Sequence, residues 1–173
     1  MHFTQILGLS LFAVGQVSCA ALPGNSTAIN VPRGELVDRA AAEPVSCGSG
    51  GDVKAYGSEA VKKAYNNGKN YWKAYDSSRC SDSGNCYPKS YGGNGGNVRA
   101  SLPAECNANS KDGTLVEWPL MGDGSIYQGG KPGPDRIVMF DSNNDGKTVN
   151  FCGVMSHRGT GGTNFYWCPR ATS

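Results

Sequence analysis

Apolar residues recur at helical spacing in one long stretch of the chain, from Ser58 to Asp76. A spacing of three or four residues puts side chains on one face of a helix, and Ser58 can cap the free N–H groups at its start. The pattern predicts one amphipathic helix, either continuous or broken in two at 66–68, where the sequence reads Asn-Asn-Gly. The apolar positions of this stretch are Val61, Ala64, Tyr65, Tyr71, Trp72 and Tyr75.

The second half of the chain carries short apolar or alternating runs, each bounded by turn residues, as antiparallel strands are. The Gly, Ser and Asn residues between Cys80 and Asn97 predict a loop, and the polar run 141–146 predicts a hairpin turn. One helix followed by several strands predicts an α+β domain in which the helix packs on an antiparallel sheet. The predicted strands are 114–120, 136–140, 148–155 and 164–168.

An apolar run near the N-terminus, residues 6–17, is followed by small residues up to Ala20. Such a run is typical of a secretory signal peptide and is too short to cross a bilayer. Residues 1–20 are therefore predicted to be a signal peptide, 21–46 a flexible arm or pro-segment, and 47–173 the folded domain. We expect a secreted, extracellular protein without a membrane anchor.

The predicted domain contains six cysteines, an even number in a secreted chain, which indicates three disulfides. Six cysteines allow fifteen pairings, and the sequence alone does not choose among them. A metal site favours several histidines or a CxxC pair, and the domain has neither, so no metal or other cofactor is expected. Its 14 Lys and Arg residues and 11 Asp and Glu residues are dispersed, which permits a polyanionic partner without requiring one.

Three ionisable residues accompany the apolar runs of the predicted sheet. Glu117 lies inside one run, Arg136 heads the next, and His157, the domain's only histidine, follows the third. Burial of such groups without partners is costly, so we expect them to converge on one face of the sheet. The alternative is a structural ion pair between Glu117 and Arg136, with an unrelated histidine.

Four short motifs occur in the order seen in a known family. They are Cys-Tyr-Pro at 86–88, Glu-Trp-Pro-Leu at 117–120, Ile-Tyr-Gln-Gly-Gly-Lys-Pro-Gly-Pro-Asp-Arg-Ile-Val at 126–138 and Gly-Val-Met-Ser-His-Arg-Gly-Thr-Gly-Gly-Thr-Asn-Phe at 153–165. From Cys47 to Cys168 the chain thereby resembles the small secreted fungal ribonucleases of the T1/N1 family. The resemblance implies the disulfide-stabilised fold of the microbial ribonucleases, with the pairs Cys47–Cys168, Cys106–Cys152 and Cys80–Cys86.

Members of this family cleave single-stranded RNA 3′ to a purine, usually guanosine, through a 2′,3′-cyclic phosphate and without a metal. The resemblance implies that Glu117 is the general base, His157 the general acid and Arg136 the cation beside the phosphate. It also implies that Tyr87 and Phe165 position and shield the phosphate.

The residues expected to read the base depart from the family pattern. Tyr91 matches the aromatic residue that stacks on guanine, although ordinary packing explains it equally well. Glycines follow where the family has an Asn-rich turn and an acidic base contact, and Thr163 stands where a second contact is usually Asn. We therefore expect a weakened preference for guanine. The candidate base-binding residues are Tyr91, Gly92, Gly93, Asn94, Thr163 and Asn164.

Two functions remain open from the sequence. The first is a monomeric endoribonuclease acting on single-stranded RNA, including the case of a cytotoxic effector, and Glu117, Arg136 and His157 favour it. The second is a catalytically weakened effector that holds RNA or a host protein without cutting. The glycine-rich loop and Lys89 favour the second, because Lys89 stands where the family usually has a histidine, and a lysine carries charge without titrating near neutral pH.

Overall fold

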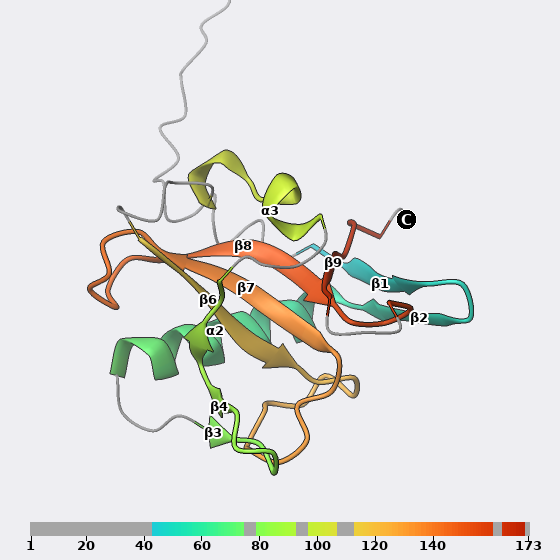
Figure 1. Cartoon of the computed structure of the whole chain (residues 1–173), viewed down its shortest axis with the longest axis horizontal. Coiled ribbons are helices and arrows are strands. Elements are labelled where there is room, and N and C mark those ends of the chain that lie inside the picture. The colour runs from blue at the N-terminus through green and yellow to red at the C-terminus, as the bar shows by residue number, and fades with distance from the viewer. Residues whose placement is uncertain (1–42, 75–78, 93–96, 107–112, 161–163, 172–173) are drawn as a thin grey trace, which may run out of the picture. The chain divides into compact units, whose positions relative to one another are not determined.

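The computed structural model describes residues 43–74, 79–92, 97–106, 113–160 and 164–171 (Figure 1). The expected signal peptide, 1–20, and residues 21–42 of the expected arm lie outside the described residues. In chain order the elements are β1 (Val45–Ser49), β2 (Asp52–Tyr56), α2 (Ser58–Ala74), β3 (Arg79–Cys80), β4 (Cys86–Tyr87), β5 (Lys89–Ser90), α3 (Val98–Ser101), the 3₁₀ turn η1 (Ala104–Cys106), β6 (Thr114–Leu120), β7 (Asp135–Asp141), β8 (Val149–Ser156) and β9 (Tyr166–Trp167).

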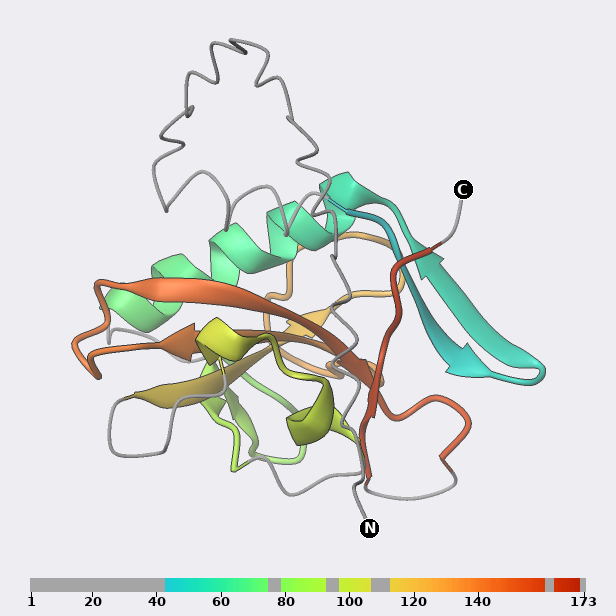
Figure 2. The ribbon, with the colours of Figure 1, turned by 90° about the horizontal axis from the view of Figure 1, so that it is seen from above.

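A five-stranded antiparallel sheet, in the order β5-β6-β7-β8-β9, forms the centre of the fold. Figure 2 shows α2 along one face of this sheet and α3 on the other. Two further antiparallel pairs, β1-β2 and β3-β4, are present in the described chain. This is the α+β arrangement that the sequence predicts. Among the described helices, none is both long and apolar enough to pass through a bilayer.

The apolar face of α2 packs on β6 and β7. Ala64 and Tyr65 are buried in one core with Trp118 and Met139, and burial of a side chain such as Met139 contributes roughly 1.5–3 kcal/mol. The helix runs unbroken through Gly68, where an added Cβ would lie 2.7 Å from Cγ of Trp118. This glycine therefore does not break the helix but lets it approach the sheet closely.

The long strands lie where the apolar runs predict them, but the short strands β1 to β5 fall outside the prediction. The expected loop between Cys80 and Asn97 contains β4 and β5, and the expectation of an unstructured loop there is wrong in part. The hairpin β1-β2 begins at Val45, two residues before the expected start of the domain, and Val45 pairs with Arg170. These strands lack a long apolar pattern because each is short, and β5 is a polar edge strand of only two residues.

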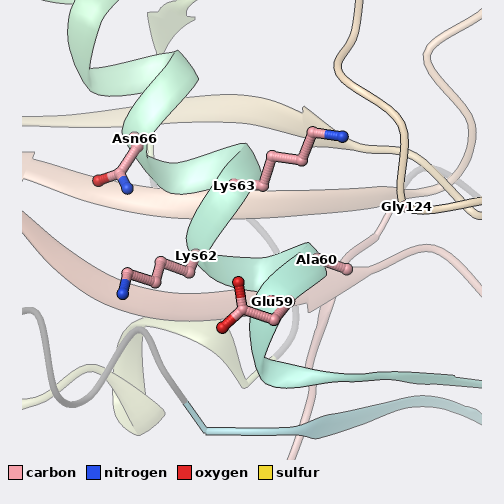
Figure 3. A pocket seen from close by; sticks show the side chains of 6 residues that line it. All are labelled: Glu59, Ala60, Lys62, Lys63, Asn66 and Gly124. Atoms are coloured by element: carbon pink, nitrogen blue, oxygen red, sulfur yellow. The ribbon is translucent and has the colours of Figure 1, made fainter.

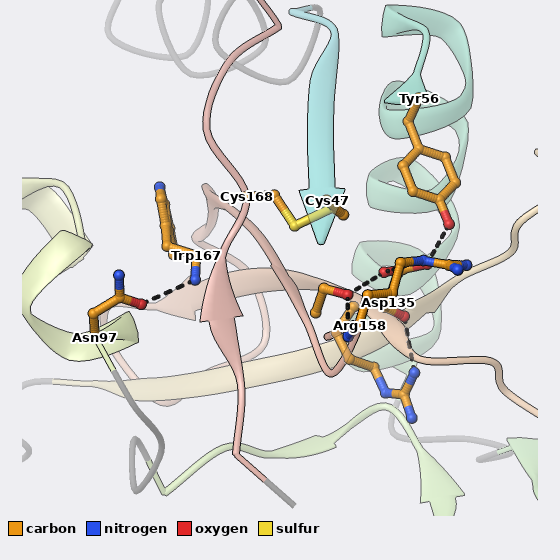
Figure 4. The surroundings of a disulfide bond; sticks show 9 residues. Cys47, Tyr56, Asn97, Asp135, Arg158, Trp167 and Cys168 are labelled. Atoms are coloured by element: carbon orange, nitrogen blue, oxygen red, sulfur yellow. Dashed lines mark hydrogen bonds and ion pairs between the residues drawn. A yellow bond between two sulfur atoms is a disulfide. The ribbon is translucent and has the colours of Figure 1, made fainter. Parts of the chain in front are cut away.

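Three disulfides link the described chain, and they are the pairs that the resemblance implies. Cys47 on β1 is bonded to Cys168 after β9, across 121 residues of sequence (Figure 4). In a chain-entropy account, closing so long a loop contributes roughly 4–5 kcal/mol. The other two pairs are Cys80–Cys86 and Cys106–Cys152.

Candidate active site

Three neighbouring parts of the sheet supply the candidate catalytic residues. Glu117 on β6 is paired with Val138 on β7, and Pro119 is paired with Arg136. Cross-strand partners share a face, as do residues two apart on one strand, so Glu117 and Arg136 point to the same side. This side carries the core beneath α3, not the core beneath α2. His157 directly follows β8, whose backbone lies two strand spacings, roughly 9–10 Å, from that of β6.

Glu117 is a buried carboxylate with one oxygen paired and one open. Only 3% of the residue is exposed. Lys89 faces it across the β5-β6 pair, with Nζ 3.2 Å from Oε1. Oε2 has no hydrogen-bond partner among the described residues. Glu117 is thus paired with Lys89 and not with Arg136, so the structural Glu117–Arg136 ion pair considered from the sequence does not describe this site.

Arg136 is fixed by hydrogen bonds, but no anion among the described residues compensates its charge. It is 5% exposed. Its Nη1 donates to the carbonyls of Gly133 and Asp135, each at 2.8 Å, and its Nη2 donates to the Tyr87 hydroxyl at 3.0 Å. Within the described ranges, its Nε has no partner and no carboxylate lies within ion-pair distance. A buried, uncompensated cation favours an anionic ligand.

The ring of His157 is fixed by two neighbours. Its Nδ1 lies 2.8 Å from the backbone oxygen of Asn164, and its ring centroid lies 3.6 Å from that of Phe165. A carbonyl oxygen only accepts, so Nδ1 carries the proton and Nε2 is the nitrogen left to exchange protons with a ligand. The backbone N–H of His157 donates to the carbonyl of Pro134 at 3.1 Å.

Tyr91 extends this aromatic group along the same face. Its N–H donates to the carbonyl of Leu115 at 2.8 Å, and its ring meets Phe165 edge-on with 5.8 Å between centroids. Burial, and then the negative charge of Glu117, raise the pKa of Tyr91 above its ordinary value. The phenol therefore keeps its proton at neutral pH, and Tyr91, Phe165 and His157 form a continuous aromatic row.

The loop after Tyr91 brings in a cation that the sequence did not single out. Nη2 of Arg99 on α3 donates to the carbonyl of Gly92 at 3.3 Å. A hollow of about 210 Å³ adjoins this contact, and Tyr91 is among the residues that line it. Nothing in the sequence marks Arg99, because α3 has only four residues and no repeating pattern. The remaining candidate base-binding residues, Gly93, Asn94 and Thr163, lie outside the described residues.

A second charged cluster lies on the other side of β7. Asp135 is fully buried and accepts hydrogen bonds from the Tyr56 hydroxyl, from Ser156 Oγ at 2.5 Å and from Arg158 Nε at 3.0 Å (Figure 4). Arg158 Nη1 also donates to Asp52 on β2 at 2.8 Å. In the sequence, this cluster is indicated only by Asp135 itself, an acidic residue directly before Arg136 in the 126–138 motif.

A larger hollow, of about 430 Å³, lies on α2 and is separate from the candidate site. Figure 3 shows the side chains of Glu59, Lys62, Lys63 and Asn66 along that helix. Because α2 covers the face of the sheet opposite to Glu117, this hollow does not join the candidate catalytic residues.

Comparison with known proteins shows the family of the chain. A family model described as ribonuclease matches residues 41–169. The chain is 29% identical to guanyl-specific ribonuclease N1 of Neurospora crassa over 171 residues, which are 92% of this chain and 94% of that protein. It is 49% identical to guanyl-specific ribonuclease U1 of Ustilago sphaerogena over 57 residues, 33% of this chain and 50% of the relative. It is 44% identical to guanyl-specific ribonuclease T1 of Aspergillus oryzae over 52 residues, which are 30% of this chain and 35% of the relative.

The matches to U1 and T1 thus span half or less of those relatives. The family model, in contrast, spans the whole described region from β1 to Cys168. The chain therefore belongs to the T1/N1 family of fungal ribonucleases.

Proposed function

We propose that this chain is a secreted, metal-independent endoribonuclease that cleaves single-stranded RNA on the 3′ side of purines. One observation carries the proposal. Arg136 is a buried cation without an anionic partner among the described residues, and it comes from the strand between Glu117 and the histidine loop. An RNA phosphate bound over β7 would compensate that charge and lie between a proton acceptor and a proton donor.

The reaction needs an acceptor on one side of phosphorus and a donor on the other. Glu117 Oε2 takes the proton of the ribose 2′-hydroxyl, and the 2′-oxygen forms a bond to phosphorus. The bond from phosphorus to the 5′-oxygen breaks, and Nε2 of His157 gives its proton to that oxygen. The products are a 2′,3′-cyclic phosphate and a free 5′-hydroxyl.

The residues around this pair stabilise the charge that develops on the phosphate. Arg136 is fixed by Tyr87 and by backbone carbonyls, so its free N–H groups need no reorganisation during the reaction. Lys89 supplies a second positive charge beside Glu117. Phe165 covers the ring of His157, which excludes water from one side of the acid.

Base preference is the finer part of the proposal. The names of the relatives call them guanyl-specific, and Tyr91 is available to stack on a purine. Glycines stand at 92, 93, 95 and 96, where an acidic side chain would otherwise contact the base edge. We infer a preference for guanosine that is weaker than a carboxylate contact would give, by about 1–3 kcal/mol for one base-edge interaction.

A second function, RNA binding without cleavage, is favoured by the Lys89–Glu117 ion pair. An ammonium group 3.2 Å from the carboxylate stabilises its charge and competes with the 2′-hydroxyl for it. In this case the same face would bind RNA through Arg136 and Lys89, and the phosphodiester would stay intact.

One assay separates the two functions. The purified protein is incubated with single-stranded RNA in excess EDTA, and the 3′ ends of the products are identified. Cyclic phosphate ends following purines support the enzyme, provided that Glu117→Gln made in the same way forms them at least about 10²-fold more slowly. Intact RNA at high protein concentration, together with retained RNA binding, supports the second function instead.

A further inference from the structure

We propose that Arg158 is a positioning residue for His157, acting through Asp135 and through Asp52 on the β1-β2 hairpin. The inference rests on the proposed function, in which His157 is the general acid. Arg158 itself donates to Asp52 and Asp135, and in this proposal it does not contact the substrate.

His157 lies between two residues that bind the same buried carboxylate. Ser156 Oγ donates to Asp135 Oδ1 at 2.5 Å, and Arg158 Nε lies 3.2 Å from Oδ1 and 3.0 Å from Oδ2. The N–H of Arg158 donates to Ser156 Oγ at 2.9 Å. These bonds form a closed ring that includes the backbone of His157, so the histidine is fixed on both sides along the chain.

Arg158 is the member of this ring that carries the compensating charge. Tyr56 and Ser156 are neutral donors, whereas Arg158 is the only cation in ion-pair contact with Asp135 among the described residues. A buried carboxylate that loses its cation becomes costly, and the structure around it rearranges to reach water or another donor. The first backbone to move would be the Ser156–Arg158 segment that includes His157.

The side chain of Arg158 also ties the histidine loop to the hairpin. Its Nη1 donates to Asp52 Oδ1 at 2.8 Å. The loop and the hairpin lie in contact: an added Cβ at Gly48 would lie 2.9 Å from Cβ of Arg158, and one at Gly159 would lie 2.7 Å from Ser49 Oγ. Both glycines have positive φ, +98° and +72°, which other residues rarely adopt. The backbone is therefore arranged so that hairpin and loop meet at Arg158.

The two contacts of Arg158 differ in strength. Asp135 is fully buried, whereas the side chain of Asp52 is 59% exposed, and exposed ion pairs contribute little. Arg158→Ala should therefore disturb His157 most. Arg158→Lys keeps the charge but loses the planar fork of donors, so its effect should be intermediate. Asp52→Ala should have the smallest effect.

The test observes the imidazole of His157 directly. The chain has only two histidines, His2 and His157, so protein labelled with ¹⁵N-histidine gives few signals, and the spectrum of His157→Ala identifies those of His157. Imidazole spectra, kcat and KM on a dinucleotide are measured well below the melting temperature of each variant. Arg170→Ala is the matched control, because Arg170 forms an exposed ion pair with Glu43 at 2.6 Å, away from the site.

We expect Arg158→Ala to shift or broaden the Nδ1–H signal and to lower kcat about tenfold or more, because small displacements of a catalytic group are costly. KM should stay within about twofold, since Arg158 makes no substrate contact in this proposal. Arg158→Lys should recover part of kcat, and Arg170→Ala should change neither signal nor rate.

The proposal is overturned if Arg158→Ala loses stability while the His157 signals and kcat stay as in the wild type. If that variant does not fold, the same comparison is made with Arg158→Lys and Asp52→Ala, and unchanged signals and rates in both overturn it. A wild-type protein that cuts no RNA, but whose His157 signals move in Arg158→Ala, refutes the proposed function and supports the positioning role.

Discussion

Asp135 and Arg136 are neighbours on β7, and both are buried, but their surroundings differ. The carboxylate of Asp135 has donors at both oxygens, from two hydroxyl groups and a guanidinium. The guanidinium of Arg136 has neutral partners only, and its Nε has none among the described residues. A fully partnered buried charge holds segments of the fold together, whereas a buried charge without a counter-charge is a candidate position for a ligand.

The alternation of a β-strand produces this division. Consecutive side chains point to opposite faces, so Asp135 meets Ser156 and the hairpin, and Arg136 lies on the side of Glu117. One strand therefore contributes to a structural cluster and to the candidate active site through adjacent residues. Substitutions on the Glu117 side should lower activity with little loss of stability, whereas substitutions in the Asp135 cluster should lower stability and, through the position of His157, activity as well.

The largest effect on stability is expected for Asp135→Ala. The change leaves Arg158 without its main partner and removes the acceptor of two hydroxyl groups, and breaking a buried ion pair in this way costs about 3–5 kcal/mol. Urea unfolding followed by circular dichroism measures it. Asp82→Ala, at an exposed carboxylate, is the control and should change stability by no more than about 0.5 kcal/mol. A loss below about 1 kcal/mol for Asp135→Ala would mean that the cluster does not hold the fold.

On the other face, Glu117→Gln should act on the rate instead. The amide keeps the shape of the side chain but cannot take the 2′-hydroxyl proton, so kcat should fall 10²-fold or more, equivalent to at least about 2.7 kcal/mol of activation free energy. His157→Ala should cost a similar factor. Rates are measured on a defined dinucleotide. Wild-type rates in both variants would assign any nuclease activity to other residues.

A smaller effect is expected for Lys89→Ala, because the side chain of Lys89 is 40% exposed. Loss of the ammonium group that holds Glu117 in place should lower kcat/KM about tenfold, below the loss typical of a buried donor. In the Glu117→Gln background the same change should lower kcat/KM less than about twofold. The contact of 3.2 Å between Lys89 Nζ and Glu117 Oε1 is already weakened there, because the amide carries no charge. Equal losses in both backgrounds would show that Lys89 acts on the substrate independently of Glu117.

The smallest effect concerns alkaline pH. Burial, and then the hydrogen bond and negative charge of Asp135, raise the pKa of Tyr56 above its ordinary value. The folded protein thus holds this proton at a pH where the unfolded chain, with a pKa near 10, releases it. The resulting stability is fully present below about pH 10 and is lost as the pH rises further. Tyr56→Phe should make the unfolding free energy fall less steeply above pH 10, and an unchanged slope would contradict this assignment.

The sequence predicts the parts of this molecule that have a repeated pattern. The helix and the three long strands carry apolar residues at regular spacing, and the ionisable residues Glu117, Arg136 and His157 stand out against them. The contact of Lys89 with Glu117 depends on β5, a two-residue strand whose pairing is set by the fold and not by its own residues. The ion pair of Asp135 with Arg158 joins positions 23 residues apart, and no local pattern indicates it.

The bond between Cys47 and Cys168 has a further consequence for a protein exposed to proteases. It closes a covalent circle around almost the whole described chain, so one backbone cut between these residues opens the circle without releasing either piece. A nicked molecule would keep its mass and, where the sheet stays intact, its candidate site. On a denaturing gel without reductant it would migrate as one band, and the two fragments would separate only after reduction, which breaks Cys47–Cys168 and Cys106–Cys152 alike.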